Sequence, residues 1–277
     1  MAKTVLAFWA IFLLASAAWA QDPVRGETVR ISGSTTLLPI TEKAAEEYLK
    51  ENPGETLTVS GTGSGEGIKS LIDGVIDLAG ASRDLKPAET ERAARQGVRL
   101  VKRIAARDGL AVVVHPGNPV RNLTLAQLRG IYLGTVTNWR QVGGEDRVIV
   151  PINRDSSSGT FEMWVEMVLL GQRHRPDAQV QSSSGAVAYA VAGNRCAVGY
   201  TGLGFLSPKV AVAAVGGVKA SLEAVTDGTY PIARDLYIFS REDISRSAQK
   251  FLDYLLGPRG QALLGAEGFA PARDSAL

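Results

Sequence analysis

Cysteine and histidine are nearly missing from this 277-residue sequence, which contains one cysteine and two histidines. One cysteine excludes an internal disulfide, and Cys196, at the start of an apolar run, is expected to be a small core residue without a redox role. A nucleophilic serine needs a base beside it, yet His115 lies in a Pro/Gly turn and His174 lies between two arginines. The acids, histidines and cysteine show no metal-ligand spacing, so neither serine nor metal catalysis is favoured.

An excess of one charge is also missing, since 30 Lys and Arg residues stand against 28 Asp and Glu residues. This balance excludes the strongly basic surface that is typical of nucleic-acid binding. The stretch at 61–67 is no nucleophile elbow, because Thr62 stands two residues before Ser64, and no dinucleotide loop, because Glu66 replaces the third glycine. A serine hydrolase or phosphatase is therefore the less favoured alternative, and the chain is expected not to be an enzyme.

A secretory signal peptide is predicted at residues 1–20. Lys3 is followed by an apolar run from Val5 to Leu14 and by the small-residue pattern Ala18-Trp19-Ala20. The run is shorter than the ~20 residues that span a bilayer, so cleavage after Ala20 is favoured over a retained anchor. No cysteine stands nearby to carry a lipid. The expected product is a free periplasmic protein.

The rest of the chain alternates short strands and helices, which predicts an α/β fold in which each lobe is a mixed, mostly parallel sheet flanked by helices. The sharp break at 115–119 predicts a first crossing between two lobes, and the extended stretch at 230–239 predicts the return. We expect one lobe from residues 26–112 and 234–277, and the other from residues 113–233. Strands are expected at 28–31, 57–59, 76–79, 110–114, 148–152 and 197–200, and helices at 39–52, 68–73, 125–131, 160–170, 184–192, 247–256 and 260–265.

Three loops share one pattern: 32–36, 61–67 and 154–160 are rich in Gly, Ser and Thr, follow a predicted strand and open a predicted helix. A helix start holds anions with its unpaired N–H groups and partial positive charge, and ligands of open α/β sheets lie beyond the strand ends. Arg154 adds a full charge that can grip two oxygens of a tetrahedral anion. Any one loop could be an ordinary helix cap, and Arg154 alone a surface residue, but together they favour an oxyanion site.

These motifs resemble the phosphate-binding proteins of ABC transporters, within the two-lobed (type II) periplasmic binding proteins. The resemblance covers nearly the whole mature chain. The segments that carry it are 33–39, 61–69, 80–83 and, most specifically, 154–160, with weaker similarity at 197–204, 227–234, 260–261 and 268–269.

The resemblance implies that phosphate is bound between the lobes and delivered to permease subunits in the inner membrane. It also implies a monomer that needs no cofactor, metal or nucleic acid. The implied phosphate-binding residues are Ser34, Thr35, Thr36, Ser64, Arg154, Ser158, Gly159 and Thr160.

Arg83 departs from the best-known members, which place at this position an acid that accepts the proton of monohydrogen phosphate. An acid there repels sulfate, which has no proton to offer, whereas an arginine does not. We expect Arg83 to face the cleft as a further binding residue; the alternatives are that it points away and pairs with an acid at the surface, or that Asp84 takes the acceptor's place. Sulfate, molybdate or tungstate binding, or a sensor without a transporter, therefore stay open as functions.

Overall fold

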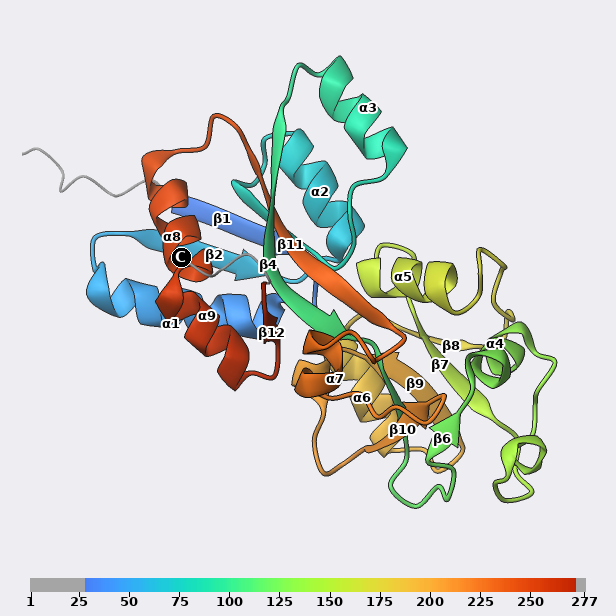
Figure 1. Cartoon of the computed structure of the whole chain (residues 1–277). Helices are drawn as coiled ribbons and strands as arrows, with labels where there is room; N and C mark the ends of the chain where they lie inside the picture. The colour runs from blue at the N-terminus through green and yellow to red at the C-terminus, as the bar shows by residue number, and fades with distance from the viewer. Residues whose placement is uncertain (1–27, 273–277) are drawn as a thin grey trace, which may run out of the picture.

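The computed structural model describes residues 28–272, so the predicted signal peptide lies outside the described residues. Two six-stranded sheets, each flanked by helices, form two lobes that lie side by side (Figure 1). No helix between residues 28 and 272 is long and apolar enough to cross a membrane.

The first lobe has the strand order β12-β4-β11-β3-β1-β2. Strands β1, β2 and β3 are parallel, whereas β11 and β4 pair antiparallel, so this sheet is more evenly mixed than expected. Its elements are β1 (Thr28–Gly33), α1 (Leu38–Glu51), β2 (Thr56–Ser60), α2 (Ser64–Ile72), β3 (Leu78–Ala81), α3 (Pro87–Arg95), β4 (Leu100–Gly109), β11 (Ala233–Arg241), α8 (Arg246–Leu256), α9 (Pro258–Ala266) and β12 (Ala270–Pro271).

The second lobe has the strand order β6-β10-β5-β9-β7-β8, with β7 parallel to both β8 and β9. Helix α6 begins and ends where the sequence predicted it. The elements are β5 (Ala111–Val114), β6 (Asn122–Leu123), α4 (Leu125–Leu133), a 3-10 helix (Trp139–Val142), β7 (Val150–Arg154), α5 (Gly159–Met167), β8 (Gln179–Gln181), α6 (Ser184–Ala192), β9 (Ala197–Thr201), a second 3-10 helix (Leu203–Phe205), β10 (Ala211–Val215) and α7 (Leu222–Thr226).

Each lobe has its own apolar core. Phe251 of α8 packs with Val29 and Tyr48 in the core of the first lobe. Trp164 of α5 is fully buried in the second core. Cys196 is only half-buried, because it lies at the entrance to β9 rather than in its centre.

The chain changes sheets at Leu110, between β4 and β5, a few residues before the predicted boundary at 112–113. The apolar run at 110–114 is the correct strand but belongs to the second sheet, where it pairs with β9 and β10. Burial on both faces gives such a strand no pattern that says which sheet it joins. The chain returns with β11, and the Leu110 amide donates to the Ile232 carbonyl (2.8 Å), so the two crossings lie against each other.

Helix α2 begins at Ser64, so most of the predicted 61–67 loop is helical. The prediction was wrong because Gly65 and Gly67 are poor helix formers in isolation. Tertiary packing requires glycine here, since a Cβ on Gly67 would lie 2.6 Å from Gly33 Cα. The helix start therefore lies against β1, close to the first loop.

We expect Gly67→Ala to lower the free energy of unfolding by about 1–3 kcal/mol, because an added methyl group would push α2 away from β1. Gly265→Ala is the matched control, since a Cβ at this position in α9 meets no atom within 4 Å. The control should be neutral or stabilising by up to about 1 kcal/mol. Urea unfolding followed by circular dichroism measures both, and equal stabilities would contradict the close contact.

Candidate functional site

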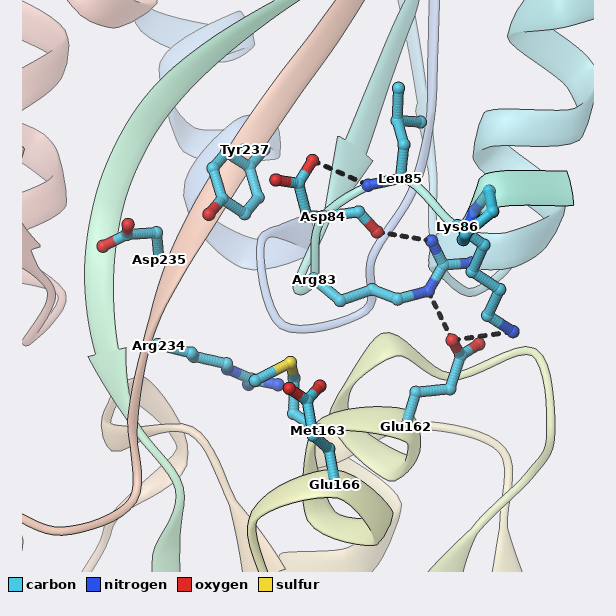
Figure 2. A pocket seen from close by; sticks show the side chains of 11 residues that line it. Arg83, Asp84, Leu85, Lys86, Glu162, Met163, Glu166, Arg234, Asp235 and Tyr237 are labelled. Atoms are coloured by element: carbon cyan, nitrogen blue, oxygen red, sulfur yellow. Dashed lines mark hydrogen bonds and ion pairs between the residues drawn. The ribbon is translucent and has the colours of Figure 1, made fainter. Parts of the chain in front are cut away.

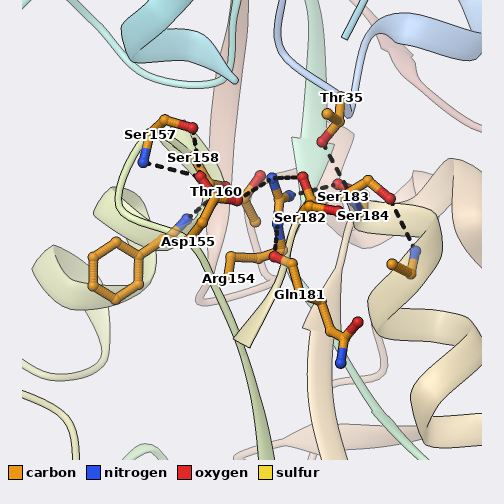
Figure 3. A network of polar contacts seen from close by, with 12 residues as sticks. Thr35, Arg154, Asp155, Ser157, Ser158, Thr160, Gln181, Ser182, Ser183 and Ser184 are labelled. Carbon is orange, nitrogen blue, oxygen red and sulfur yellow. Dashed lines mark hydrogen bonds and ion pairs between the residues drawn. The ribbon is translucent and has the colours of Figure 1, made fainter. Parts of the chain in front are cut away.

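The three Gly/Ser/Thr loops meet where the two lobes face each other, a region that we call the seam. A cleft of about 400 Å³ lies on one side of the seam. Arg83, Glu162 and Glu166 help to line it (Figure 2). Figure 3 shows the polar network beside it, around Arg154 and Thr160. Seven of the predicted site residues are at most 5% exposed: Ser34, Thr35, Thr36, Ser64, Arg154, Ser158 and Thr160.

Hydroxyl groups from both lobes make direct contact in the seam. The Thr36 hydroxyl of the first lobe lies 3.1 Å from the Thr160 hydroxyl and 3.2 Å from the Ser184 hydroxyl of the second lobe. The Ser184 amide donates to the Thr35 hydroxyl across the same gap (3.3 Å). These hydroxyls can turn either a proton or a lone pair toward a ligand.

Three helix starts converge on these hydroxyls, because α2, α5 and α6 begin at Ser64, Gly159 and Ser184. A Cβ on Gly159 would lie 2.5 Å from Ser64 Oγ, so only glycine lets α5 approach α2 this closely. The start of α6 was predicted as a helix but not as part of the site. Converging helix starts concentrate partial positive charge at one point.

Three predicted donors already have partners inside their own lobe. Ser158 Oγ accepts from the Phe161 amide (3.2 Å) and so caps α5. Ser64 Oγ accepts from the Ser82 amide (3.0 Å), and the Ser34 hydroxyl bonds that of Ser82. The accepting hydroxyls of Ser158 and Ser64 still carry a proton that they can donate to an anion.

Arg154 is buried at the end of β7, with its side chain 1% exposed. Its guanidinium donates to Ser184 Oγ (3.2 Å) and to the Gln181 and Ser182 carbonyls (3.1 and 3.2 Å). Burial lowers the pKa of Arg154 from its ordinary value, and the charge of Asp155 at 3.3 Å offsets this only in part. The charge of Arg154 is therefore held in place and incompletely compensated.

Arg234 is a second buried cation, and it was not predicted as a site residue from the sequence. It lies on β11 directly opposite Asp108 on β4, and Nη2 pairs with the Asp108 carboxylate at 2.9 Å. Its other contacts are with both lobes: Nη1 donates to Thr160 Oγ1 (2.9 Å) and Nη2 to Thr36 Oγ1 (3.3 Å). Burial lowers the pKa of Arg234 despite Asp108.

A sequence signal for Arg234 did exist. Residues of β11 alternate between buried and half-buried positions, and Arg234 falls in the buried series with Ile232, Leu236 and Ile238. An arginine at a core position of an otherwise apolar strand must be paired and is a candidate for function.

Arg83 lines the cleft, as expected, but its hydrogen-bond partners are groups other than the hydroxyl cluster. Its guanidinium donates to both Glu89 oxygens at 2.7 Å and to the Asp84 carbonyl, while Nε forms an ion pair with Glu162 at 2.6 Å (Figure 2). Burial acts to lower the pKa of Arg83, but the two carboxylates outweigh it and raise the pKa. Arg83 therefore pairs with two acids while it lines the cleft, rather than turning away to an acid at the surface.

Asp84 does not take the acceptor's place either. Its side chain is half exposed and pairs with Lys102 at 2.6 Å, away from the hydroxyl cluster. Between residues 28 and 272, no group of three or more His, Cys, Asp or Glu side chains is arranged to hold a metal ion.

The aromatic residues below Arg154 give the site a rigid base. The Tyr200 ring stacks on the Trp164 ring with centroids 4.1 Å apart and planes 4° apart. The Tyr200 hydroxyl bonds Asn153 and accepts from the Arg154 amide at 3.4 Å. Since Trp164 lies on α5, this stack ties the start of α5 to the end of β7.

Comparisons with known proteins agree on one kind of relative. A sequence family described as a PBP superfamily domain matches residues 18–259. The phosphate-binding protein PstS of Bacillus subtilis is 30% identical over 260 residues, which cover 91% of this chain and 85% of the relative. The protein SphX of Synechococcus elongatus is 32% identical, covering 88% of this chain and 77% of the relative.

Solved structures give the same picture. A putative phosphate ABC transporter substrate-binding protein from Clostridium perfringens, solved with bound phosphate, superposes with a TM-score of 0.84 at 33% identity and covers 89% of this chain and 100% of that one. An ABC-type phosphate transport receptor from Vibrio cholerae has a TM-score of 0.73 at 31% identity, covering 89% and 100% of the two chains.

We expect Asp108→Ala to lower the free energy of unfolding by about 3–5 kcal/mol, because it would leave the Arg234 charge buried without its carboxylate. Asp84→Ala is the control, since Asp84 and Lys102 are both about half exposed and such pairs contribute little. Urea denaturation compares the two variants with the parent. Losses of similar size would show that Asp108 does not compensate a buried charge.

Proposed function

Because the chain belongs to the PBP superfamily, with phosphate-binding proteins of ABC transporters as its relatives, we propose that it binds inorganic phosphate in the seam and delivers it to an importer. Delivery would be to permease subunits at the inner membrane, by a monomer in the periplasm. The observation that carries the proposal is the convergence of two incompletely compensated arginines and three helix starts on one hydroxyl cluster.

In this proposal each part of the cluster has a distinct role. Arg154 and Arg234 provide fixed positive charge, and hydrogen bonds from charged donors are the strongest that a site can offer. Thr36 and Thr160 would exchange their mutual bond for bonds to phosphate oxygens. Amides at the starts of α2 and α5 would donate to the remaining oxygens. No bond is made or broken, so the protein binds phosphate without catalysis.

Binding would be coupled to closure, because each lobe holds only part of the cluster. Thr35 and Thr36 belong to the first lobe, while Arg154, Thr160 and Ser184 belong to the second. An anion captured by one lobe would gain the donors of the other when the hinge at the two crossings closes. The closed form would also exclude water and strengthen each hydrogen bond.

Selectivity would depend on hydroxyls rather than on an acid at position 83. Arg83 is engaged by Glu89 and Glu162, and the two acids next to the cluster, Asp108 and Asp155, each pair with an arginine. A hydroxyl can accept a hydrogen bond from the P–OH group of monohydrogen phosphate, but it can equally donate a hydrogen bond to sulfate. Discrimination between the two should therefore be weaker than a free carboxylate would give.

Calorimetric titration of protein unfolded and refolded to remove bound ligand, at two pH values, tests the ligand. We expect phosphate and arsenate to bind, since both present the same charge and proton, and sulfate to bind measurably but more weakly. Binding of sulfate and molybdate with the same affinity as phosphate would make the protein a general oxyanion receptor. Lack of binding by all four anions would overturn the proposal.

The variant Arg154→Ala should weaken phosphate binding by roughly 10- to 100-fold, because each hydrogen bond to a charged group contributes ~1.5–3 kcal/mol. Arg173→Ala is the matched control, since Arg173 is exposed in the same lobe. The same titration measures both variants, with thermal unfolding to show that they fold. Parent-like affinity in folded Arg154→Ala would remove this residue from the site.

A further inference from the structure

Arg83 reaches from the first lobe to the second. Its Nε forms an ion pair with Glu162 Oε2 on α5 at 2.6 Å, and Lys86 Nζ lies 2.8 Å from the same oxygen (Figure 2). Arg83 and Lys86 follow β3 in the first lobe, so both cations contact the second lobe through one carboxylate. This contact requires the two lobes to be close together.

The first lobe fixes Arg83 for this contact. Glu89 of α3 accepts from both terminal nitrogens of Arg83 at 2.7 Å, and the Asp84 carbonyl accepts from Nη1 at the same distance. A guanidinium held in this way loses little further rotamer freedom when it meets another carboxylate. Only Glu162 has to approach.

The ion pair is shielded from water. The Arg83 side chain is 5% exposed and the Glu162 side chain is 16% exposed. Exposed ion pairs contribute little to stability because water and salt screen them. The Arg83–Glu162 pair is mostly buried, so this screening is weaker.

Glu162 lies one helical turn from the start of α5, which belongs to the hydroxyl cluster. Gly159 at that start faces Ser64 Oγ, and a Cβ there would lie 3.1 Å from Arg83 Cγ. Immediately before the helix, the Ser157 carbonyl accepts from the Gly65 amide across the seam (3.0 Å). Pairing of Glu162 with Arg83 thus holds the starts of α5 and α2 against each other.

We propose that Arg83 and Glu162 form an interlobe clasp: they position the start of α5 and stabilise the closed arrangement of the lobes, with or without an anion, and do not touch the anion. The proposal rests on the proposed function for its ligand. Because the pair forms only on closure, it should slow release of the anion and leave capture almost unchanged. Because it does not touch the anion, it should act equally on phosphate and sulfate.

The test compares Glu162→Gln with Glu166→Gln. Glu166 lies one turn further along α5, lines the same cleft, is exposed, and forms no ion pair with any residue in the range 28–272. Glu162→Gln should weaken phosphate binding about tenfold through faster dissociation, because it replaces the charged carboxylate that Arg83 and Lys86 both contact. The ratio of phosphate to sulfate affinity should stay that of the parent, and Glu166→Gln should match the parent throughout.

Two results would overturn the clasp. Parent-like affinity and dissociation rate in Glu162→Gln would show that the ion pair does not stabilise the loaded form. A changed ratio of phosphate to sulfate affinity would show that Glu162 acts on the anion itself rather than through α5. Calorimetry gives the affinities, and stopped-flow fluorescence gives the dissociation rates.

A second variant covers the case in which Glu162→Gln does not fold. Lys86 is half exposed, so Lys86→Glu should be tolerated, and it would place a like charge beside Glu162. Faster dissociation with an unchanged affinity ratio is again expected, and a parent-like rate would contradict the clasp.

Failure of the proposed function would be visible separately, as lack of phosphate binding by the parent. The clasp would then be judged by small-angle X-ray scattering of the parent, Glu162→Gln and Glu166→Gln without anions. A larger radius of gyration in Glu162→Gln alone would support an interlobe contact. Equal radii in all three would overturn it.

Discussion

The burial of two arginine charges is the constraint on which the rest of the seam depends. Arg154 and Arg234 are almost without exposure, and a buried charge is tolerated only when neighbouring groups compensate it. Asp108 and Asp155 supply part of that compensation, while hydroxyls and carbonyls supply the rest. The compensation is incomplete, since burial still lowers the pKa of both arginines. In the proposed function, an anion in the seam would supply the compensation that is missing.

In the proposed function, the position of Arg234 would couple anion binding to closure. Arg234 and Asp108 face each other on β11 and β4, the strands that lead into the two crossings. The charge therefore lies near the hinge, in contact with hydroxyls from both lobes. Arg83 differs from these two arginines, because Glu89 and Glu162 compensate its charge and the pair with Glu162 joins the two lobes.

Much of the fold could be predicted from the sequence, because local patterns determine it. Amphipathic spacing, caps and breaks placed most strands and helices, and the 184–192 helix was predicted at its observed bounds. The start of α2 was missed because Gly67 is a poor helix former whose presence is explained only by contact with Gly33. The crossing at Leu110 was misplaced because a strand buried on both faces does not indicate its sheet.

The sequence by itself determined the chemistry of the site: hydroxyl-rich helix starts after strands, one arginine beside them, and no base or metal cluster. Only the tertiary structure decided which arginines contact the hydroxyl cluster. Nothing in the sequence distinguishes Arg83 from Arg234 by its partners. In the structure, Arg83 pairs with two carboxylates, whereas Arg234 donates to hydroxyls of both lobes. Side chains that are near one another in the sequence can be assigned to the same helix start from their spacing. The carboxylates and hydroxyls that compensate the charge of an arginine are distant in sequence and come together only on folding.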